Sequence, residues 1–214
     1  MDLTIPDKSF LLLIIARRKS GKTHLIIELL TNPKYLAKKF DKIIIISPTL
    51  EFDTTWINSS IDFDASNIDV YDVFDQELLS SIINSQTQHL INYGKENTDE
   101  ILLILDDCIS EQSTKMRSGN GLTKISNNGR HLNISIILTA QRVTGIIPDI
   151  RSQFDSMIVF HTDSKRELEN LKQDINISDE MIICNTREDF SFINFLKVTG
   201  GKTEVYDSKN KRIL

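Results

Sequence analysis

The sequence predicts an α/β fold in which a mostly parallel sheet is flanked by helices. Short runs of aliphatic and β-branched residues alternate with longer polar or amphipathic segments along the chain. Apolar runs of this kind are typical of parallel strands that crossover helices bury on both faces. The 214 residues, 40% hydrophobic and 26% charged, have the composition of one globular domain. Without a repeat or a dividing linker, residues 1–214 are expected to form a single domain, with a core at about 10–160 and a C-terminal extension over 161–214.

The individual elements follow from the spacing of the apolar residues. Strands are predicted at Phe10–Ala16, Lys42–Ser47, Ile101–Asp106, Ile134–Thr139 and Ser156–His161. Helices are predicted at Lys22–Leu30, Gln76–Tyr93 and Lys165–Asp174, with a short turn at Ile146–Ser152, where Pro148 sits early and its missing N–H is tolerated. Phe190–Val198 and Thr203–Tyr206 predict an antiparallel hairpin at a sheet edge. Gln112–Gly129 is the most loop-like segment, because glycine and asparagine gather there.

Composition also indicates where the protein acts. The longest apolar run, Phe10–Ala16, is far shorter than the roughly 20 residues of a membrane helix, and it follows acidic residues rather than a basic leader. Cys108 and Cys184 are far apart and belong to no CxxC motif, which favours neither a zinc site nor a disulfide framework. We therefore expect an intracellular protein with no membrane partner.

The charge pattern bears on nucleic-acid binding. A net charge of −5 argues against a protein that coats nucleic acid with its whole surface. However, no acidic residue lies between Glu111 and Asp149, a stretch that contains Lys115, Arg117, Lys124, Arg130 and Arg142. A local basic patch therefore remains open.

A phosphate-binding motif follows the first predicted strand. The segment Ala16-Arg17-Arg18-Lys19-Ser20-Gly21-Lys22-Thr23 leads directly into a predicted helix. A P-loop needs inward-facing N–H groups at a helix N-terminus, a lysine that reaches the β and γ phosphates, and a hydroxyl for Mg²⁺. We expect Ser20, Gly21, Lys22 and Thr23 to bind nucleotide in this way, with Thr23 as a metal ligand. The alternative is a basic strand-to-helix turn, which Ala16 favours because the P-loop pattern has glycine there.

A second Gly-Lys-Thr serves as an internal comparison. Gly201-Lys202-Thr203 is followed by Glu204-Val205-Tyr206, which resembles a strand and not a helix. We interpret this copy as the turn of the predicted hairpin.

Two carboxylates end the third predicted strand. Asp106 and Asp107 follow Ile101-Leu102-Leu103-Ile104-Leu105, as a Walker B element requires. Asp106 would act through Mg²⁺, and Asp107 would polarise the attacking water in the place where many ATPases have a longer glutamate. The alternative is an acidic cap at the end of an ordinary strand.

Two further polar residues fit a hydrolytic site. Gln141 ends another apolar strand and would face the γ-phosphate or its water if that strand lies between the two motif strands. Arg130 could enter a neighbouring subunit's site as an arginine finger, with Arg142 and Arg151 as rivals. A surface or DNA-facing cation is the alternative interpretation of Arg130.

These motifs, in this order, resemble the genome-packaging ATPases of nucleocytoplasmic large DNA viruses and virophages, a branch of the FtsK/HerA superfamily. The block from Asn128 to Phe160, with Gly-Arg-His-Leu-Asn-Ile-Ser-Ile-Ile-Leu-Thr-Ala-Gln and Ile-Pro-Asp-Ile-Arg, carries most of the likeness, which extends from Phe10 to about Phe160. The chain departs from the family pattern at three places. Ala16 replaces the usual glycine, Asp107 replaces the usual glutamate, and Arg17-Arg18-Lys19 makes the loop unusually cationic.

The resemblance implies a P-loop NTPase fold of the RecA/ASCE type and a homo-oligomeric ring that hydrolyses ATP with Mg²⁺. It further implies that the ring moves double-stranded DNA, without reading its sequence, into a preformed capsid, and that a capsid or portal-vertex protein is a partner. The expected location is the host cytoplasm or viral factory, or the virion. By position, Lys22 and Thr23 take the Walker A roles, Asp106 and Asp107 the Walker B roles, Gln141 the sensor role and Arg130 the trans-acting arginine role.

Two other functions stay open at this point. A nucleoside or nucleotide kinase has a P-loop and a similar size, although its cationic lid comes late in the chain, whereas the basic residues here precede Gln141. A degenerate P-loop scaffold that binds nucleotide or DNA without turnover is motivated by Ala16 and Asp107. A GTPase is disfavoured because the chain lacks Asn-Lys-x-Asp for guanine recognition.

Overall fold

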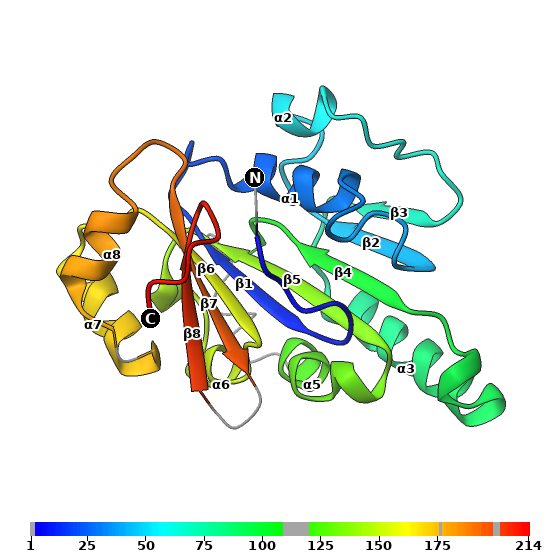
Figure 1. Ribbon diagram of the computed structural model, residues 1–214. Coiled ribbons are helices and arrows are strands. Elements are labelled where there is room, and N and C mark those ends of the chain that lie inside the picture. Colours follow the sequence, from blue (N-terminus) through cyan, green and yellow to red (C-terminus); the bar gives the residue numbers. More distant parts are fainter. Residues whose placement is uncertain (1–2, 109–119, 176, 199–201) are drawn as a thin grey trace.

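A computed structural model, which describes residues 3–108, 120–175, 177–198 and 202–214, contains an eight-stranded sheet in the order β3-β2-β4-β5-β1-β6-β7-β8 (Figure 1). The first six strands are parallel and run β1 Leu11–Ile15, β2 Lys42–Ile46, β3 Ile68–Tyr71, β4 Ile101–Leu105, β5 Ile134–Ala140 and β6 Ser156–Phe160. The last two, β7 Phe192–Val198 and β8 Lys202–Asp207, are antiparallel. The predicted α/β class and the C-terminal hairpin are thereby confirmed. Residues 199–201, on which the predicted hairpin turn with Gly201 falls, lie outside the described residues.

The central strands were predictable because they are buried on both faces. Every residue of β1, β4, β5 and β6 is buried, so each of these strands is a nearly continuous apolar run. The edge strand β3 was missed for the opposite reason. It has only four residues, Ile-Asp-Val-Tyr, and none of them is fully buried.

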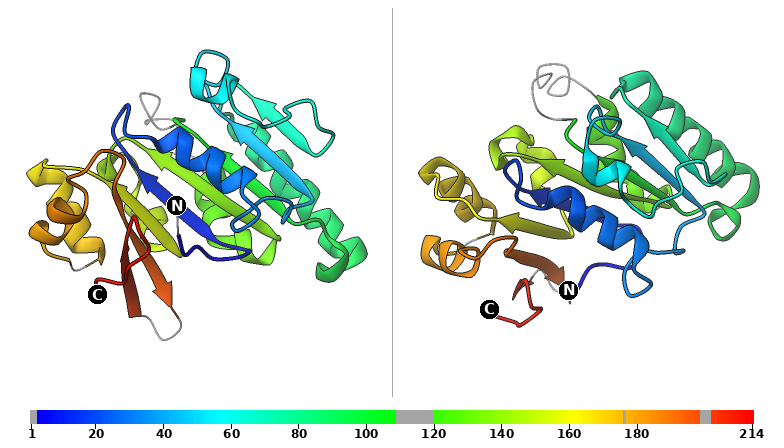
Figure 2. Two further views of the ribbon diagram at one scale, coloured as in Figure 1. Left: turned by 45° about the horizontal axis from the view of Figure 1, so that its top comes forward. Right: turned by 90° about the horizontal axis from the view of Figure 1, so that it is seen from above.

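Helices cover both faces of the sheet (Figure 2). The structure has α1 Lys22–Thr31, α2 Thr54–Ile57, α3 Gln76–Tyr93, α5 Asn120–Asn128, α6 Pro148–Ser152, α7 Lys165–Ile175 and α8 Asp179–Asn185, with 3₁₀ turns η1 Lys95–Asn97, η2 Gly129–His131 and η3 Val143–Gly145. One apolar core packs α1 and Trp56 of α2 against one face, and a second packs α3, α5, α6, α7 and α8 against the other. None of the helices in the described part of the chain is long and apolar enough to cross a membrane.

The loop predicted at Gln112–Gly129 is corrected by α5. Residues 120–128 are helical, whereas 112–119 lie outside the described residues. Leu122 and Ile125, spaced by three residues, are 3% and 0% exposed and face the core. This short apolar stripe holds the helix in place despite the glycine and asparagine content of the segment.

Strand order determines which loops meet. Because β5 lies between β1 and β4, the residues that follow these three parallel strands share one edge of the sheet. The antiparallel β7 begins at that edge, since Phe192, its first residue, pairs with Phe160, the last residue of β6. The carboxyl ends of the parallel strands and the segment that precedes β7 therefore lie side by side.

Candidate nucleotide-binding site

The segment between β1 and α1 has the backbone of a phosphate-binding loop. Gly21 caps α1 with φ of 91°, in the left-handed region, and its carbonyl accepts from the Leu25 N–H at 2.9 Å. A side chain at residue 21 would be strained by this φ, and its Cβ would lie 2.7 Å from Cδ1 of Phe190. The positive φ favours glycine there, and any other residue would also have to displace the exposed ring of Phe190.

Ala16 does not disturb this loop. Its N–H donates to the Ala140 carbonyl at 2.9 Å, which extends the pairing of β1 with β5 by one residue. Its methyl group is 2% exposed and packs in the core on the α1 face. Residue 16 is not among the residues with positive φ, so it has no need of glycine.

Lys22 joins the two predicted motifs directly. Its Nζ lies 3.0 Å from Asp106 Oδ1 and 2.6 Å from Asp107 Oδ1. Lys22 and Asp106 are almost fully buried, with side chains 8% and 1% exposed, whereas Asp107 is 23% exposed. Because burial strengthens charge interactions and penalises unpaired charges, this triad is a strongly coupled unit.

Neighbouring hydrogen bonds fix the two carboxylates. Trp56 Nε1 donates to Asp106 Oδ2 at 3.1 Å, and Thr139 Oγ1 donates to Asp106 Oδ1 at 2.8 Å. The same Thr139 hydroxyl accepts from the Asp107 N–H at 3.0 Å. This bond helps to hold Asp107 at φ of 80°, a conformation that aspartate tolerates better than most residues.

The residues present fit a magnesium site. Thr23 Oγ1 donates to Asp53 Oδ2 at 3.2 Å, while Asp53 Oδ1 caps α2 by accepting from the Thr55 N–H. The oxygen of Thr23 thus keeps lone pairs for a cation, and Asp106 regains one acceptor position whenever Lys22 moves away. The described residues contain no group of three or more His, Cys, Asp or Glu able to hold a metal. The hydroxyl of Thr23 and the carboxylate of Asp106 are oxygen ligands of the kind that Mg²⁺ takes together with substrate phosphates.

A cavity of about 1000 Å³ lies over these groups. It is lined by the loop residues 16–19 and 21–23, by the polar residues His24, Glu28, Asp53, Thr54, Thr55, Asp107 and Gln141, and by the apolar residues Leu25, Phe160, Phe190 and Phe192. Gln141 directly follows β5, as the sequence predicts for a sensor position. The lining of the cavity therefore combines charged and polar groups with aromatic side chains.

The three candidate arginines lie in different environments. Arg130 is in η2, before β5 begins, and pairs with Asp155 at 3.4 Å with its own side chain 63% exposed. Arg142 is exposed beside Gln141, where it lines a second cavity of about 370 Å³. Arg151 is nearly buried, lies 3.0 Å from Asp174 and donates to the Val143 carbonyl. Arg151 is thus engaged within its own chain, while Arg130 and Arg142 are accessible.

The basic segment is described only in part. Lys115 and Arg117 lie outside the described residues, while Lys124 is exposed on α5. Both cysteines are free, and Cys108 is buried beside the carboxylates. Burial, and next the charge of Asp106, raise the pKa of the Cys108 thiol far above its usual range, which keeps it protonated and unreactive.

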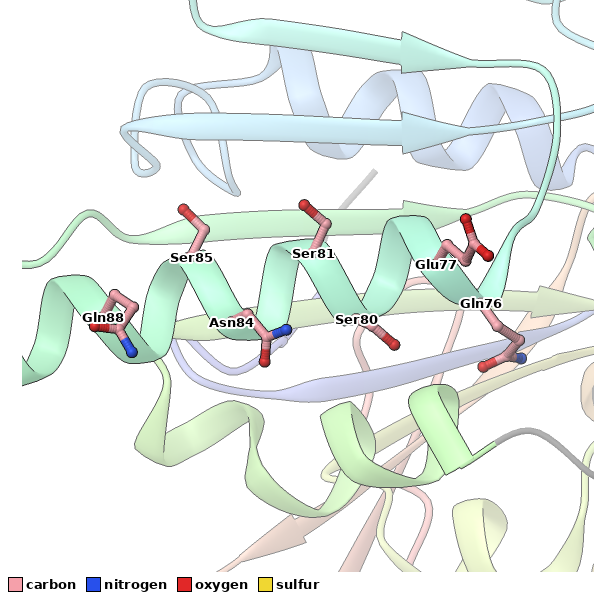
Figure 3. Close-up of a pocket in the computed structure, with 7 residues that line it drawn as sticks. All are labelled: Gln76, Glu77, Ser80, Ser81, Asn84, Ser85 and Gln88. Atoms are coloured by element: carbon pink, nitrogen blue, oxygen red, sulfur yellow. The ribbon is translucent and has the colours of Figure 1, made fainter.

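A further hollow runs along α3 (Figure 3). The side chains that line it between Gln76 and Gln88 are polar and come from this one helix. They include no cation that could bind a phosphate. We therefore place the candidate site at the cavity above Lys22 rather than along α3.

Four residues of the site were not singled out from the sequence. Asp53, Trp56 and Thr139 orient the predicted residues, and Phe190 packs on the loop. A clue was available for Asp53, since Asp-Thr-Thr is a helix-capping pattern. The roles of the other three depend on contacts between distant segments.

The chain is similar to several viral proteins. The family described as "Poxvirus A32 protein" matches residues 3–203. Uncharacterized protein L437 of Acanthamoeba polyphaga mimivirus is 26% identical over 161 residues, which is 72% of this chain and 53% of that protein. Uncharacterized protein 075L of Invertebrate iridescent virus 6 is 30% identical over 105 residues, which is 48% of this chain and 38% of that protein. The chain thus spans about half or less of the length of these relatives.

Solved structures share the fold. The genome packaging NTPase B204 of Sulfolobus turreted icosahedral virus 2, in complex with AMPPCP, has a TM-score of 0.62 at 21% identity, covering 94% of this chain and 98% of that one. The DNA-packaging ATPase B204 of Sulfolobus turreted icosahedral virus has a TM-score of 0.64 at 18% identity, covering 98% and 100%. The P-loop NTPase fold expected from the sequence is thereby confirmed.

Removal of the buried cation should destabilise the protein. We expect Lys22→Ala to lower the free energy of unfolding by about 3 kcal/mol, because it leaves Asp106 buried beside a second carboxylate without a counter-charge. Urea denaturation measures the change. Lys42→Ala, which breaks a more exposed pair with Asp69, is the matched control and should cost under about 1 kcal/mol. Equal effects of the two variants would contradict the coupling assigned to the triad.

For stability, the hydroxyl group of Thr139 should matter more than the shape of the side chain. Thr139→Val keeps the volume but removes one donor and one acceptor, and should lower the free energy of unfolding by about 2 kcal/mol. Thr139→Ser keeps the hydroxyl and should stay closer to wild type. Thermal and urea denaturation of the two variants separate these effects. A serine variant as unstable as the valine variant would show that packing, not hydrogen bonding, sets the role of Thr139.

Proposed function

Because the chain belongs to the poxvirus A32 protein family, we propose that it is an ATP-hydrolysing, ring-forming motor that moves double-stranded viral DNA into a preformed capsid. The family membership confirms the resemblance to viral packaging ATPases stated from the sequence. The observation that carries the proposal is that Lys22, Asp107 and Gln141 line one cavity, while Lys22 also pairs with the buried Asp106. The motor acts in the cytoplasm or viral factory of the infected cell.

Lys22 has a different partner before and after nucleotide binds. Without phosphate its ammonium neutralises Asp106 and Asp107. The β and γ phosphates of ATP offer a competing set of anions at the N-terminus of α1, where loop N–H groups also favour negative charge. Transfer of Lys22 to the phosphates would free both carboxylates at the moment when their charge is needed.

The remaining residues then divide the chemistry. Asp107, once released, accepts a proton from the attacking water, and Gln141 orients that water from the adjacent strand. Thr23 and Asp106 would hold Mg²⁺, with Trp56 and Thr139 keeping the Asp106 carboxylate in position. When bound, the ion supplies positive charge that stabilises the charge developing on the phosphates.

The DNA and assembly partners are proposed from the charge pattern and from the family resemblance. Lys124 and Arg130, with Lys115 and Arg117 upstream, form the basic segment that would line the pore and contact phosphates without reading bases. Arg130 would complete the site of the next subunit. A capsid or portal-vertex protein would anchor the ring.

Turnover should require both motifs and respond to DNA. We expect Mg²⁺-dependent ATP hydrolysis to rise with linear double-stranded DNA and with protein concentration, because the active site forms in an assembly. Lys22→Ala and Asp107→Asn should reduce turnover by about 100-fold or more, since they remove the phosphate-binding cation and the base. Phosphate release measures the rate, and Lys42→Ala is the control for loss of a lysine.

Two other outcomes of this experiment would favour a different function. Hydrolysis indifferent to DNA and to protein concentration would contradict the motor and favour a kinase acting on a small acceptor. Tight ATP binding with no turnover under any condition would favour an assembly scaffold.

A mixing experiment tests whether Arg130 acts in trans. Arg130→Ala and Lys22→Ala should each be inactive alone, but an equimolar mixture should regain activity, because about a quarter of random interfaces join an intact Lys22 to an intact Arg130. The same mixture made with Arg142→Ala tests the rival residue. Recovery with Arg142→Ala but not with Arg130→Ala would transfer the role to Arg142.

A further inference from the structure

We propose that the ring of Phe190 is the platform on which the base of the nucleotide stacks, so that the site takes purine nucleoside triphosphates. This inference rests on the proposed nucleotide function and extends it to the base, which the phosphate-binding residues do not contact. It is carried by three observations: the position of Phe190 on the loop, its strained and exposed conformation, and the apolar residues that line the same cavity.

The fold brings Phe190 to the phosphate loop from a distant part of the chain. The antiparallel β7 starts at the carboxyl edge of the sheet, with Phe192 opposite Phe160. Just before it, Ser191 makes a tight turn in which its N–H and hydroxyl both donate to the Glu188 carbonyl, at 3.1 and 2.6 Å. This turn directs residue 190 toward Gly21, whose missing side chain leaves the space that the ring edge fills.

Phe190 is an unusual residue for its surroundings. Its φ of 62° places a bulky side chain in the left-handed region, which is costly for any residue other than glycine, asparagine or aspartate. Its side chain is 68% exposed, so core packing offers little compensation. An exposed aromatic ring held in a strained conformation beside a binding loop is better explained by a ligand than by stability.

The cavity offers both kinds of chemistry that a nucleotide needs. Lys22, Thr23 and Asp107 suit the phosphates, and Leu25, Phe160 and Phe192 line the same cavity as Phe190. Phe160 and Phe192 pack together with ring centroids 5.4 Å apart. A flat aromatic face beside an apolar wall suits a nucleobase, and a larger purine gains more from stacking than a pyrimidine.

Calorimetric binding of two probes tests the proposal. With Mg²⁺ present, we expect Phe190→Gly to bind the non-hydrolysable analogue AMPPCP about tenfold more weakly than wild type, the size of one lost aromatic–base stack. The same variant should bind inorganic tripolyphosphate, which has no base, as wild type does. Phe190→Trp should retain AMPPCP binding, and wild type should prefer AMPPCP and its guanine counterpart to the cytosine counterpart.

Phe190→Gly also separates binding from folding. Glycine relieves the positive φ, so the variant should unfold at the same urea concentration as wild type or a higher one. Tyr93→Ala, which removes another largely exposed aromatic ring at the end of α3, is the matched control and should leave both probes unaffected. A structural role for the ring would instead lower stability and weaken both probes together.

The outcomes distinguish this inference from the function on which it rests. Absence of AMPPCP binding in wild type would overturn the proposed function itself. Binding in wild type that Phe190→Gly leaves unchanged, or strengthens because the ring was an obstacle, would overturn only the base platform.

Discussion

The ion triad of Lys22, Asp106 and Asp107 is the interaction on which the rest of the site depends. It requires the first residue of α1 and the two residues after β4 to meet where Lys22 and Asp106 are almost fully buried and Asp107 is partly exposed. Burial of an ion pair is unfavourable unless its lone pairs and protons find partners. Thr139 and Trp56 provide those partners for Asp106. The triad therefore depends on the hydrogen bonds that Thr139 and Trp56 donate to Asp106.

The topology of the sheet brings the residues of the site together. Parallel strands deliver their carboxyl ends to one edge, and the adjacency of β1, β5 and β4 brings the loop lysine, Gln141 and the acids together. An antiparallel strand delivers its amino end to the same edge. That single reversal at β7 is what brings Phe190, far away in the sequence, onto the phosphate loop. The residues proposed to recognise phosphate and base thus come from opposite ends of the chain.

The same physics explains how much the sequence could predict. Strands such as β1 and β4 are buried on both faces, so their apolar runs mark them within about a residue, and the motifs that follow them could be assigned by spacing. The short β3 and α5 carry few apolar residues and are stabilised by packing, which local pattern does not reveal. Trp56 and Thr139 were likewise invisible, because each acts through a hydrogen bond to a residue more than thirty positions away.

The proposed role of Arg130 requires a second copy of the chain. Arg130 precedes β5, whereas Gln141 follows it, so the seven residues of the strand, about 23 Å in extended form, separate the two ends. Over that distance Arg130 would not reach phosphates held by the Lys22 of its own chain. It can do so only where the amino edge of one sheet faces the carboxyl edge of another, a head-to-tail contact of the kind that closes rings. In such an assembly the arrival of a neighbour, rather than of nucleotide alone, would complete the charge balance around the γ-phosphate.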